Sequence, residues 1–450
     1  MKKNDRVQVT IEDMKFSNLG IAHLEGKEIK IKNALIGQTV EIGLSKIKAK
    51  KAKGKVKEVI KRADYEIEAP CIHYDVCGGC SRQTMPIENQ GQLKEKLVKE
   101  LFKRNNFEVE TFEPIILSPD TFHYRNKMEY SFGDASYGGE LNLGMHKKGM
   151  FYDVVNTTSC LIATKDSNKI QETVLNYARE SGLKKYHIKK HEGYFRHLSV
   201  RKGFKTGEIL VGIVTTTQNE LDYEPLIKEL LNLDLDGKIV GILHVKNDNF
   251  SDVVQGEYDI LYGRDYYYEE LLGLKFKISF YSFFQTNPLG AEELYSVVKE
   301  YLGNARDKRV MELFSGTGTI GQIVSDESKE VFGVELIQDA VDMANENAKE
   351  NNIENCIFIQ GNVFKEVASL EFKPDTIILD PPRYGIPKKA FNKILDFEVD
   401  EIIYVSCNAQ GLMDNLHEAI PRGYEIKKVR CIDMFPHTPH IETMCFLKRK

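Results

Sequence analysis

The stretch Glu312-Leu313-Phe314-Ser315-Gly316-Thr317-Gly318-Thr319-Ile320-Gly321 decides the fold of the carboxyl-terminal part of the chain. It ends an apolar strand and opens a helix, and its glycines stand where a backbone must turn sharply and lie close to a ligand. Glu335 ends the next predicted strand, at the spacing of a carboxylate that accepts hydrogen bonds from ribose hydroxyls. The pattern predicts a nucleoside-bearing cofactor bound at Gly316, Gly318 and Glu335.

Strands alternate with helices throughout the region from Ala291 onward. This alternation specifies a doubly wound, Rossmann-like parallel sheet, which we expect over residues 286–450. The predicted strands cover residues 309–314, 331–336, 356–360, 376–379 and 402–405. Ligands of such sheets bind at the carboxyl edge, where the parallel strands end.

A second motif, Asp380-Pro381-Pro382-Arg383, follows the fourth of these strands. The prolines remove backbone donors and stiffen the chain, so that the Asp380 carboxylate can face the pocket. A nicotinamide dinucleotide is the alternative occupant of the glycine loop, but this motif is foreign to dehydrogenases and typical of methyltransferases. Enzymes that methylate exocyclic amines usually have an aromatic last residue in this pattern, so Arg383 disfavours that reaction.

Cys407 ends the fifth strand and is expected at the same edge as Gly316 and Asp380. Buried core packing is the usual fate of a cysteine, but its place at this edge favours a nucleophile. Glu442 lies in a proline-stiffened turn that enters the last strand, and it is our candidate for a general base. A capping or surface glutamate is the alternative.

Five ordered motifs resemble those of the RNA (uracil-5-)-methyltransferase family. They are Phe284-Gln285-Thr286-Asn287, Leu313-Phe314-Ser315-Gly316-Thr317-Gly318, Leu379-Asp380-Pro381-Pro382-Arg383, Val405-Ser406-Cys407-Asn408 and His440-Ile441-Glu442-Thr443. The resemblance implies transfer of a methyl group from S-adenosylmethionine to carbon 5 of a uridine, with Cys407 as nucleophile and Glu442 as base. It further implies that the donor is held by Gln285, Phe314, Gly316, Gly318, Glu335, Asn362 and Asp380.

The amino-terminal residues 1–62 read as short alternating strands separated by turn residues, which predicts a small β-barrel. Its last part carries seven lysines suited to contact RNA phosphates, although a solvated edge strand is the alternative: Lys46, Lys48, Lys50, Lys51, Lys53, Lys55 and Lys57. By resemblance this region is an OB-like TRAM domain. Residues 63–285 are expected to form a mostly antiparallel α+β central domain, with the amphipathic helix 89–107 packed on the catalytic domain.

Three close cysteines, Cys71, Cys77 and Cys80, precede Cys160 by about eighty residues. This spacing lacks the two close pairs of an ordinary zinc ribbon, although zinc remains an alternative. It also lacks the usual thiol spacing of radical adenosylmethionine enzymes. The ribosomal-RNA branch of the family has this arrangement, so the resemblance implies a 4Fe-4S cluster held by these four residues.

The chain has 450 residues, a formal net charge of -5 and no apolar run of the length that a membrane span needs. We therefore expect a multidomain, cytoplasmic and monomeric protein that does not bind membranes. The TRAM-like region and the cysteines favour 23S ribosomal RNA with a flipped-out uridine, because the transfer-RNA branch typically lacks both. A transfer-RNA uridine methyltransferase and a non-catalytic RNA-binding or ribosome assembly protein are the alternatives.

Overall fold

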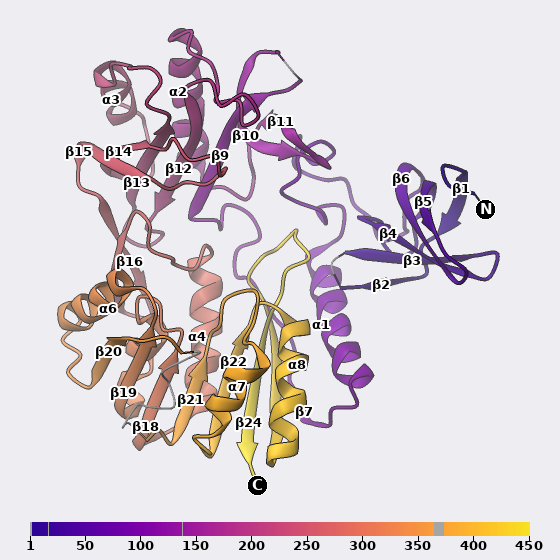
Figure 1. Ribbon diagram of the computed structural model, residues 1–450, viewed down its shortest axis with the longest axis vertical. Helices are drawn as coiled ribbons and strands as arrows, with labels where there is room; N and C mark the ends of the chain where they lie inside the picture. The colour runs from indigo at the N-terminus through magenta and orange to yellow at the C-terminus, as the bar shows by residue number, and fades with distance from the viewer. Residues whose placement is uncertain (1, 17, 137, 364–372) are drawn as a thin grey trace.

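The computed structural model describes residues 2–16, 18–136, 138–363 and 373–450. Figure 1 shows three bodies: an amino-terminal sheet at the right, a central sheet at the top and a carboxyl-terminal sheet at the bottom. No helix in these ranges is both long and apolar enough to cross a membrane. The predicted fold class is confirmed: a strand-rich amino-terminal region, a central α+β region and an α/β region.

The amino-terminal body is a six-stranded sheet that surrounds its own apolar cluster. Alternating residues of β5 such as Val40, Ile42 and Leu44 are buried. Lysines at the end of β5 and along β6 are exposed. The strands in sheet order are β1 (Arg6–Thr10), β5 (Thr39–Ile47), β6 (Lys51–Lys61), β4 (Lys27–Lys32), β3 (Leu19–Leu24) and β2 (Asp13–Lys15). The ladder runs from β1 to β2, and among the described residues these two end strands do not pair.

The central body is a seven-stranded sheet in which, within the described part of the chain, only the β13–β14 ladder and one β9–β11 pair are parallel. Its strands are β10 (Leu141–Lys147), β11 (Met150–Asn156), β9 (Lys127–Asp134), β12 (Phe195–Lys202), β13 (Glu208–Thr215), β14 (Lys238–Lys246) and β15 (Glu257–Gly263). The helices α2 (Lys165–Glu180) and α3 (Glu224–Leu231) share one apolar cluster with this sheet. A hairpin of β16 (Tyr266–Leu271) and β17 (Leu274–Ser279) leads down to the third body (Figure 1).

The carboxyl-terminal sheet is the predicted doubly wound one. Its parallel strands are β20 (Cys356–Gln360), β19 (Ser328–Glu335), β18 (Ala305–Leu313), β21 (Thr376–Leu379) and β22 (Glu401–Ser406). Beyond β22, the antiparallel β24 (Glu442–Arg449) is inserted before β23 (Tyr424–Asp433). The sheet therefore ends in an antiparallel pair that carries the last motif.

Two apolar clusters cover the two faces of this sheet, because successive strand residues point to opposite sides. Ile403 and Val405 of β22 pack on one side with α4 (Pro288–Leu302), α5 (Thr319–Ile323) and α6 (Gln338–Glu350). Ile402 and Tyr404 pack on the other side with α1 (Ile87–Arg104), α7 (Lys388–Leu395) and α8 (Ala409–Ala419).

Elements from the segment expected as the central domain also join this body. The short strands β7 (Val109–Phe112) and β8 (Ile116–Leu117) pair with β23 in parallel and extend the catalytic sheet. Helix α1 places Val98, Leu101 and Phe102 in the same cluster as α8. This pairing could not be predicted from the sequence, because a strand of four residues is too short to show a pattern that identifies its partner.

Candidate active site

The glycine loop between β18 and α5 has the strained geometry that its sequence predicts. Phe314, Gly316 and Gly318 have φ angles of 65°, 54° and 70°, in the left-handed region that favours glycine. A Cβ atom on Gly318 would lie 2.6 Å from the Phe358 ring, so no larger residue fits there. The amide N–H of Gly316 donates to the Glu335 carboxylate at 3.0 Å, which ties the loop to the end of β19.

Glu335 also accepts hydrogen bonds from the N–H groups of Leu336 and Ile337, at 2.8 and 3.0 Å. Both of these groups donate to Oε1, whereas Oε2 accepts only from Gly316 among the described residues, so Oε2 keeps a lone pair for a further donor. Asn362 is half-buried just after β20, next to the strand that ends at Glu335. The loop, Glu335 and Asn362 thus lie at the carboxyl edge of three neighbouring strands.

Glu312 is a carboxyl group of this region that the sequence reasoning missed. Its side chain is 1% exposed and accepts a hydrogen bond from the Gly321 N–H at 3.0 Å, across the glycine loop. Burial raises its pKa well above the ordinary value, and the charges of Asp380 and Glu335 add to the shift. A glutamate within an otherwise apolar, buried strand was the available signal.

Asp380 ends β21, and burial raises its pKa to about 7. The Gln285 side chain hydrogen-bonds the hydroxyl of Tyr295 in α4, whose pKa is raised by burial and then by the charges of Asp380 and Glu312. Gln285 and Asp380 therefore approach the same buried tyrosine from the segment before α4 and from the sheet. The residues Phe314, Gly316, Gly318, Glu335, Asn362 and Asp380 follow the ends of neighbouring parallel strands, and Gln285 lies in the segment before α4.

Cys407 and Glu442 lie opposite each other on adjacent antiparallel strands. Ser406 of β22 pairs with Thr443 of β24, so the next residues outward are Cys407 and Glu442. Glu442 is 5% exposed, and Cys407 is half-buried. Cys407 is thus not enclosed in the core, unlike Cys431 and Cys445.

Acidic neighbours shape the charge of this pair. Burial raises the pKa of the Cys407 thiol to about 12, and the charges of Glu442 and Asp380 add to the effect. Burial and Asp380 raise the pKa of Glu442 to about 8. Arg383 opposes both shifts. A cation placed among these groups would favour their ionised forms.

Arg383 and Asn408 join the two loops that carry Asp380 and Cys407. The Asn408 side chain accepts from the Gly411 N–H at the start of α8 and donates to the Arg383 carbonyl oxygen at 3.1 Å. The Arg383 guanidinium lies 3.2 Å from Nδ1 of His440, whose pKa is lowered to about 4 by burial and the charge of Arg383. The His440 ring is therefore neutral and can accept this hydrogen bond.

The four cysteines of the predicted cluster line one cavity of about 130 Å³ in the central body. Burial raises the pKa of Cys80 to about 12, and the other three thiols add to this shift. The described residues contain no group of three or more His, Cys, Asp or Glu side chains arranged to hold a metal ion. Four thiols share one space here, and a metal centre is not shown.

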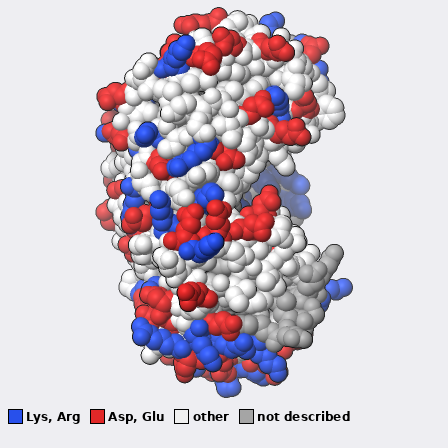
Figure 2. Space-filling view, turned by 90° about the vertical axis from the view of Figure 1, so that its left-hand side faces the viewer, with Lys and Arg blue, Asp and Glu red and all other residues white. Residues whose placement is uncertain are grey.

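The predicted lysines are all exposed on β5, β6 and the turn between them. This body lies at the right of Figure 1, away from the side shown in Figure 2. On the side in Figure 2, acidic and basic side chains are interleaved over most of the surface, and the outline is indented between the upper and lower bodies. The lysine-rich strands therefore offer a cationic surface unlike that mixed face.

Comparison with known proteins gives a full-length match. A profile described as tRNA (uracil-5-)-methyltransferase matches residues 88–450. An uncharacterized RNA methyltransferase of Clostridium tetani is 46% identical over 451 residues, which cover 100% of this chain and 99% of that protein. One from Caldanaerobacter subterraneus subsp. tengcongensis is 44% identical over 450 residues, covering 100% of both.

A solved structure matches almost the whole chain as well. It is the Pyrococcus abyssi tRNA (uracil-54, C5)-methyltransferase in complex with S-adenosyl-L-homocysteine. The TM-score is 0.77 at 25% sequence identity, covering 98% of this chain and 100% of that chain. The similarity therefore includes the amino-terminal and central bodies in addition to the doubly wound sheet.

Proposed function

This chain belongs to the tRNA (uracil-5-)-methyltransferase family, and from that premise we propose that it methylates carbon 5 of a uridine in 23S ribosomal RNA. The donor is S-adenosylmethionine, Cys407 is the nucleophile and Glu442 is the base. The observation that carries this assignment is the placement of Cys407 and Glu442 on adjacent strand ends, within electrostatic reach of Asp380.

Carbon 5 of uracil is a poor nucleophile, and covalent catalysis solves this problem. The Cys407 thiol first loses its proton to water, and the resulting thiolate adds to carbon 6. The electron pair moves toward carbon 5, which forms a bond to the donor's methyl carbon as the methyl–sulfur bond breaks. Glu442 then removes the proton from carbon 5, the double bond between carbons 5 and 6 re-forms, and the thiolate leaves. Both residues end the cycle as they began, once Glu442 has lost its proton to water and the Cys407 thiolate has regained one from water.

S-adenosylmethionine supplies an electrophilic methyl group on a cationic sulfonium. We assign its binding to Gln285, Phe314, Gly316, Gly318, Glu335, Asn362 and Asp380. The fit rests on the open left-handed loop at Gly316, where a Cβ atom would meet nothing within 4 Å, and on the carboxyl groups gathered nearby. Acidic groups favour a cation, and the methyl transfer leaves a neutral thioether in its place.

We further assign a 4Fe-4S cluster to Cys71, Cys77, Cys80 and Cys160, with a structural role. The thiols surround a space of about 130 Å³, which suits a cluster of several atoms better than a single ion. The methyl transfer involves no electron, so the cluster contributes by tying the cysteine loops to the central sheet.

Two RNA classes compete as substrate. The lysines of β5 and β6 suit the phosphates of a large RNA, and a target uridine must leave its stack to reach Cys407. Transfer RNA is the second candidate, because the solved transfer-RNA enzyme matches the whole chain, including the amino-terminal body. Because a transfer-RNA enzyme also matches the amino-terminal body, the presence of this body does not distinguish a ribosomal-RNA substrate from a transfer-RNA substrate. An RNA substrate in either class fits a cytoplasmic, monomeric enzyme.

The test uses transcripts of 23S ribosomal RNA and of transfer RNA that contain 5-fluorouridine, incubated with S-adenosylmethionine. Fluorine on carbon 5 cannot leave as a proton, so the covalent protein–RNA complex should persist on a denaturing gel. We expect trapping by the wild type with the ribosomal transcript and none with Cys407→Ala. Trapping with transfer RNA alone would reassign the substrate, and trapping by Cys407→Ala would remove the proposed nucleophile.

A further inference from the structure

The segment that connects β23 to β24, here called the 434–440 turn, leads directly into Glu442. Groups from distant segments of the chain hold its backbone. Four consecutive carbonyl oxygens accept hydrogen bonds: Met434 from Asn287 Nδ2 (2.8 Å), Phe435 from Lys94 Nζ (3.1 Å), Pro436 from the Tyr124 hydroxyl (3.0 Å) and His437 from the N–H groups of Ser81 (2.9 Å) and Arg82 (3.1 Å). A turn bound at so many points has little freedom to shift.

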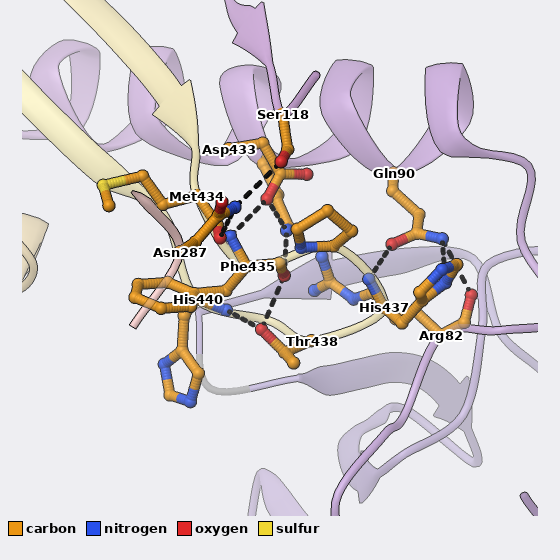
Figure 3. Close-up of polar contacts among 12 residues, drawn as sticks. Arg82, Gln90, Ser118, Asn287, Asp433, Met434, Phe435, His437, Thr438 and His440 are labelled. Carbon is orange, nitrogen blue, oxygen red and sulfur yellow. Dashed lines mark hydrogen bonds and ion pairs between the residues drawn. The ribbon is translucent and has the colours of Figure 1, made fainter. Parts of the chain in front are cut away.

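Helix α1 makes the buried polar contacts to this turn. Lys94 donates to the Asp433 carboxylate at 2.6 Å, and both side chains are 1% exposed. Gln90 accepts from the His437 N–H at 2.8 Å and donates to the carbonyl oxygens of Arg82 and Met85. Figure 3 shows Gln90 reaching from the helix between His437 and Arg82, while Asn287 reaches Met434 from the other side.

Two features indicate that these contacts impose a geometry. His437 has a φ angle of 65°, a conformation that a non-glycine residue keeps only where its surroundings enforce it. The Lys94–Asp433 pair is removed from water, so desolvation offsets much of its attraction and the pair is a poor source of net stability. Its definite effect is to fix Asp433, which in turn accepts from the Phe435 N–H at 3.1 Å.

The nucleophile is held mainly by elements other than this turn, which reaches its surroundings through the 3.2 Å contact between His440 Nδ1 and the Arg383 guanidinium. Cys407 lies at the end of β22, which pairs with β21 on one side and β24 on the other. Asn408, the next residue, caps α8 and binds the Arg383 carbonyl oxygen. A displaced turn would therefore move Glu442, at the first position of β24, more than it would move the thiol.

We propose that Lys94 and Gln90 of α1 are positioning residues for Glu442, so that proton removal from carbon 5 depends on a helix outside the doubly wound fold. The inference rests on the proposed function, since it assigns Glu442 the role of base. It distinguishes two halves of the reaction: attack and methyl transfer need Cys407 and the donor, and release needs the positioned carboxylate.

The experiment compares Lys94→Met and Gln90→Met with Lys96→Met, an exposed lysine of the same helix, as matched control. Each folded variant reacts in a single turnover with the 5-fluorouridine transcript that the wild type traps, and with the same transcript containing uridine. We expect both test variants to trap the fluorinated RNA at the wild-type rate. Release of methylated ordinary RNA should slow by roughly 10- to 100-fold, with accumulation of the methylated adduct. Lys96→Met should match the wild type in both reactions.

A double variant separates positioning from stability. Lys94→Met with Asp433→Leu removes both partners of the buried pair and should regain part of the melting temperature lost in Lys94→Met, because the Asp433 carboxylate is no longer left without its lysine. The buried Arg82 guanidinium stays in place in both variants. We expect the release step of the double variant to stay slow. Wild-type release in Gln90→Met and in the double variant would overturn the proposal, as would a parallel slowing of both reactions in folded protein. Failure of the wild type to trap fluorinated RNA would instead overturn the proposed function.

Discussion

Cys407 and the four cavity cysteines present the same side chain in two different electrostatic settings. At the edge that carries Cys407, burial opposes ionisation of the thiol, and the charges of Glu442 and Asp380 add to this effect. In the cavity, burial and the neighbouring thiols oppose it. In both settings, a nearby positive charge would favour the thiolate over the thiol. In our proposal the edge at Cys407 receives a passing sulfonium, and the cavity, which all four cysteines line, holds a resident metal centre.

The largest effect should follow Cys407→Ala. Without the thiol, carbon 5 is not activated, so we expect methyl transfer to fall by at least about 10⁴-fold. Transfer of radiolabelled methyl groups to RNA measures the loss, and the melting temperature should stay close to that of the wild type because the residue lies at the surface of the core. Substantial residual transfer would mean that the two thiol settings do not differ in the way described.

Cys80→Ala should give the converse result. If the cavity thiols hold a metal centre, loss of one ligand removes binding free energy that belongs to folding. We expect less bound iron and a melting temperature lower by several degrees, with methyl transfer per folded molecule reduced far less than in Cys407→Ala. Iron analysis and thermal melts of the two variants, purified side by side without oxygen, give the comparison. Unchanged iron content and melting temperature would refute the ligand role.

Glu442→Gln tests whether the ionised Glu442 carboxylate destabilises the folded protein. The pKa of Glu442 is raised from its ordinary value of 4.5 to about 8, so between these values the folded protein holds a proton that the unfolded chain releases. Wild-type stability contributed by this group is therefore lost as pH rises through that window. Glutamine does not ionise, so its advantage in melting temperature over the wild type should grow from about pH 5 to about pH 8.5. An advantage independent of pH would contradict the raised pKa.

The smallest effect should come from exposed side chains beside the two sites. Tyr384, beside Arg383 at the catalytic edge, is 74% exposed, and Ile72, beside Cys71 at the cavity, is 79% exposed. An exposed aromatic ring can stack on an RNA base, which contributes about 1 kcal/mol, so Tyr384→Ala should raise the KM for RNA about fivefold. Tyr384→Phe should keep the wild-type KM, and Ile72→Ala serves as the matched control. Equal effects of Tyr384→Ala and Ile72→Ala would remove the distinction.

The parallel sheet and its loops were predictable because their signals are local. The predicted strands 356–360 and 376–379 coincide with β20 and β21, and the predicted ends of the other three differ by a few residues. Gly316 and Gly318 have the left-handed φ angles that their motif requires. The edge position of Cys407 follows from its place at a strand end. The ligand roles assigned to these residues stay predictions.

What the sequence did not reveal depends on distant partners. Lys94 stands in a helix of alternating charged and apolar residues and reads as a solvent-facing lysine. It is buried because Asp433, 339 residues away along the chain, comes to meet it. Glu312 was overlooked although its signal is local, because its partner Gly321 is only 9 residues further along the chain. No periodicity in one segment can encode a partner in another.

The pairing of β7 with β23 has a consequence for synthesis of the chain. Glu110 of β7 meets Lys427 of β23 across a separation of 317 residues. A ribosome that adds roughly 5 to 20 residues per second needs about 15 to 60 seconds to bridge that interval. Throughout that time the nascent β7 has no strand to pair with, and its free backbone groups are open to misassembly. Slow translation or cold growth should therefore increase the demand of this protein for chaperones that shield unpaired strands.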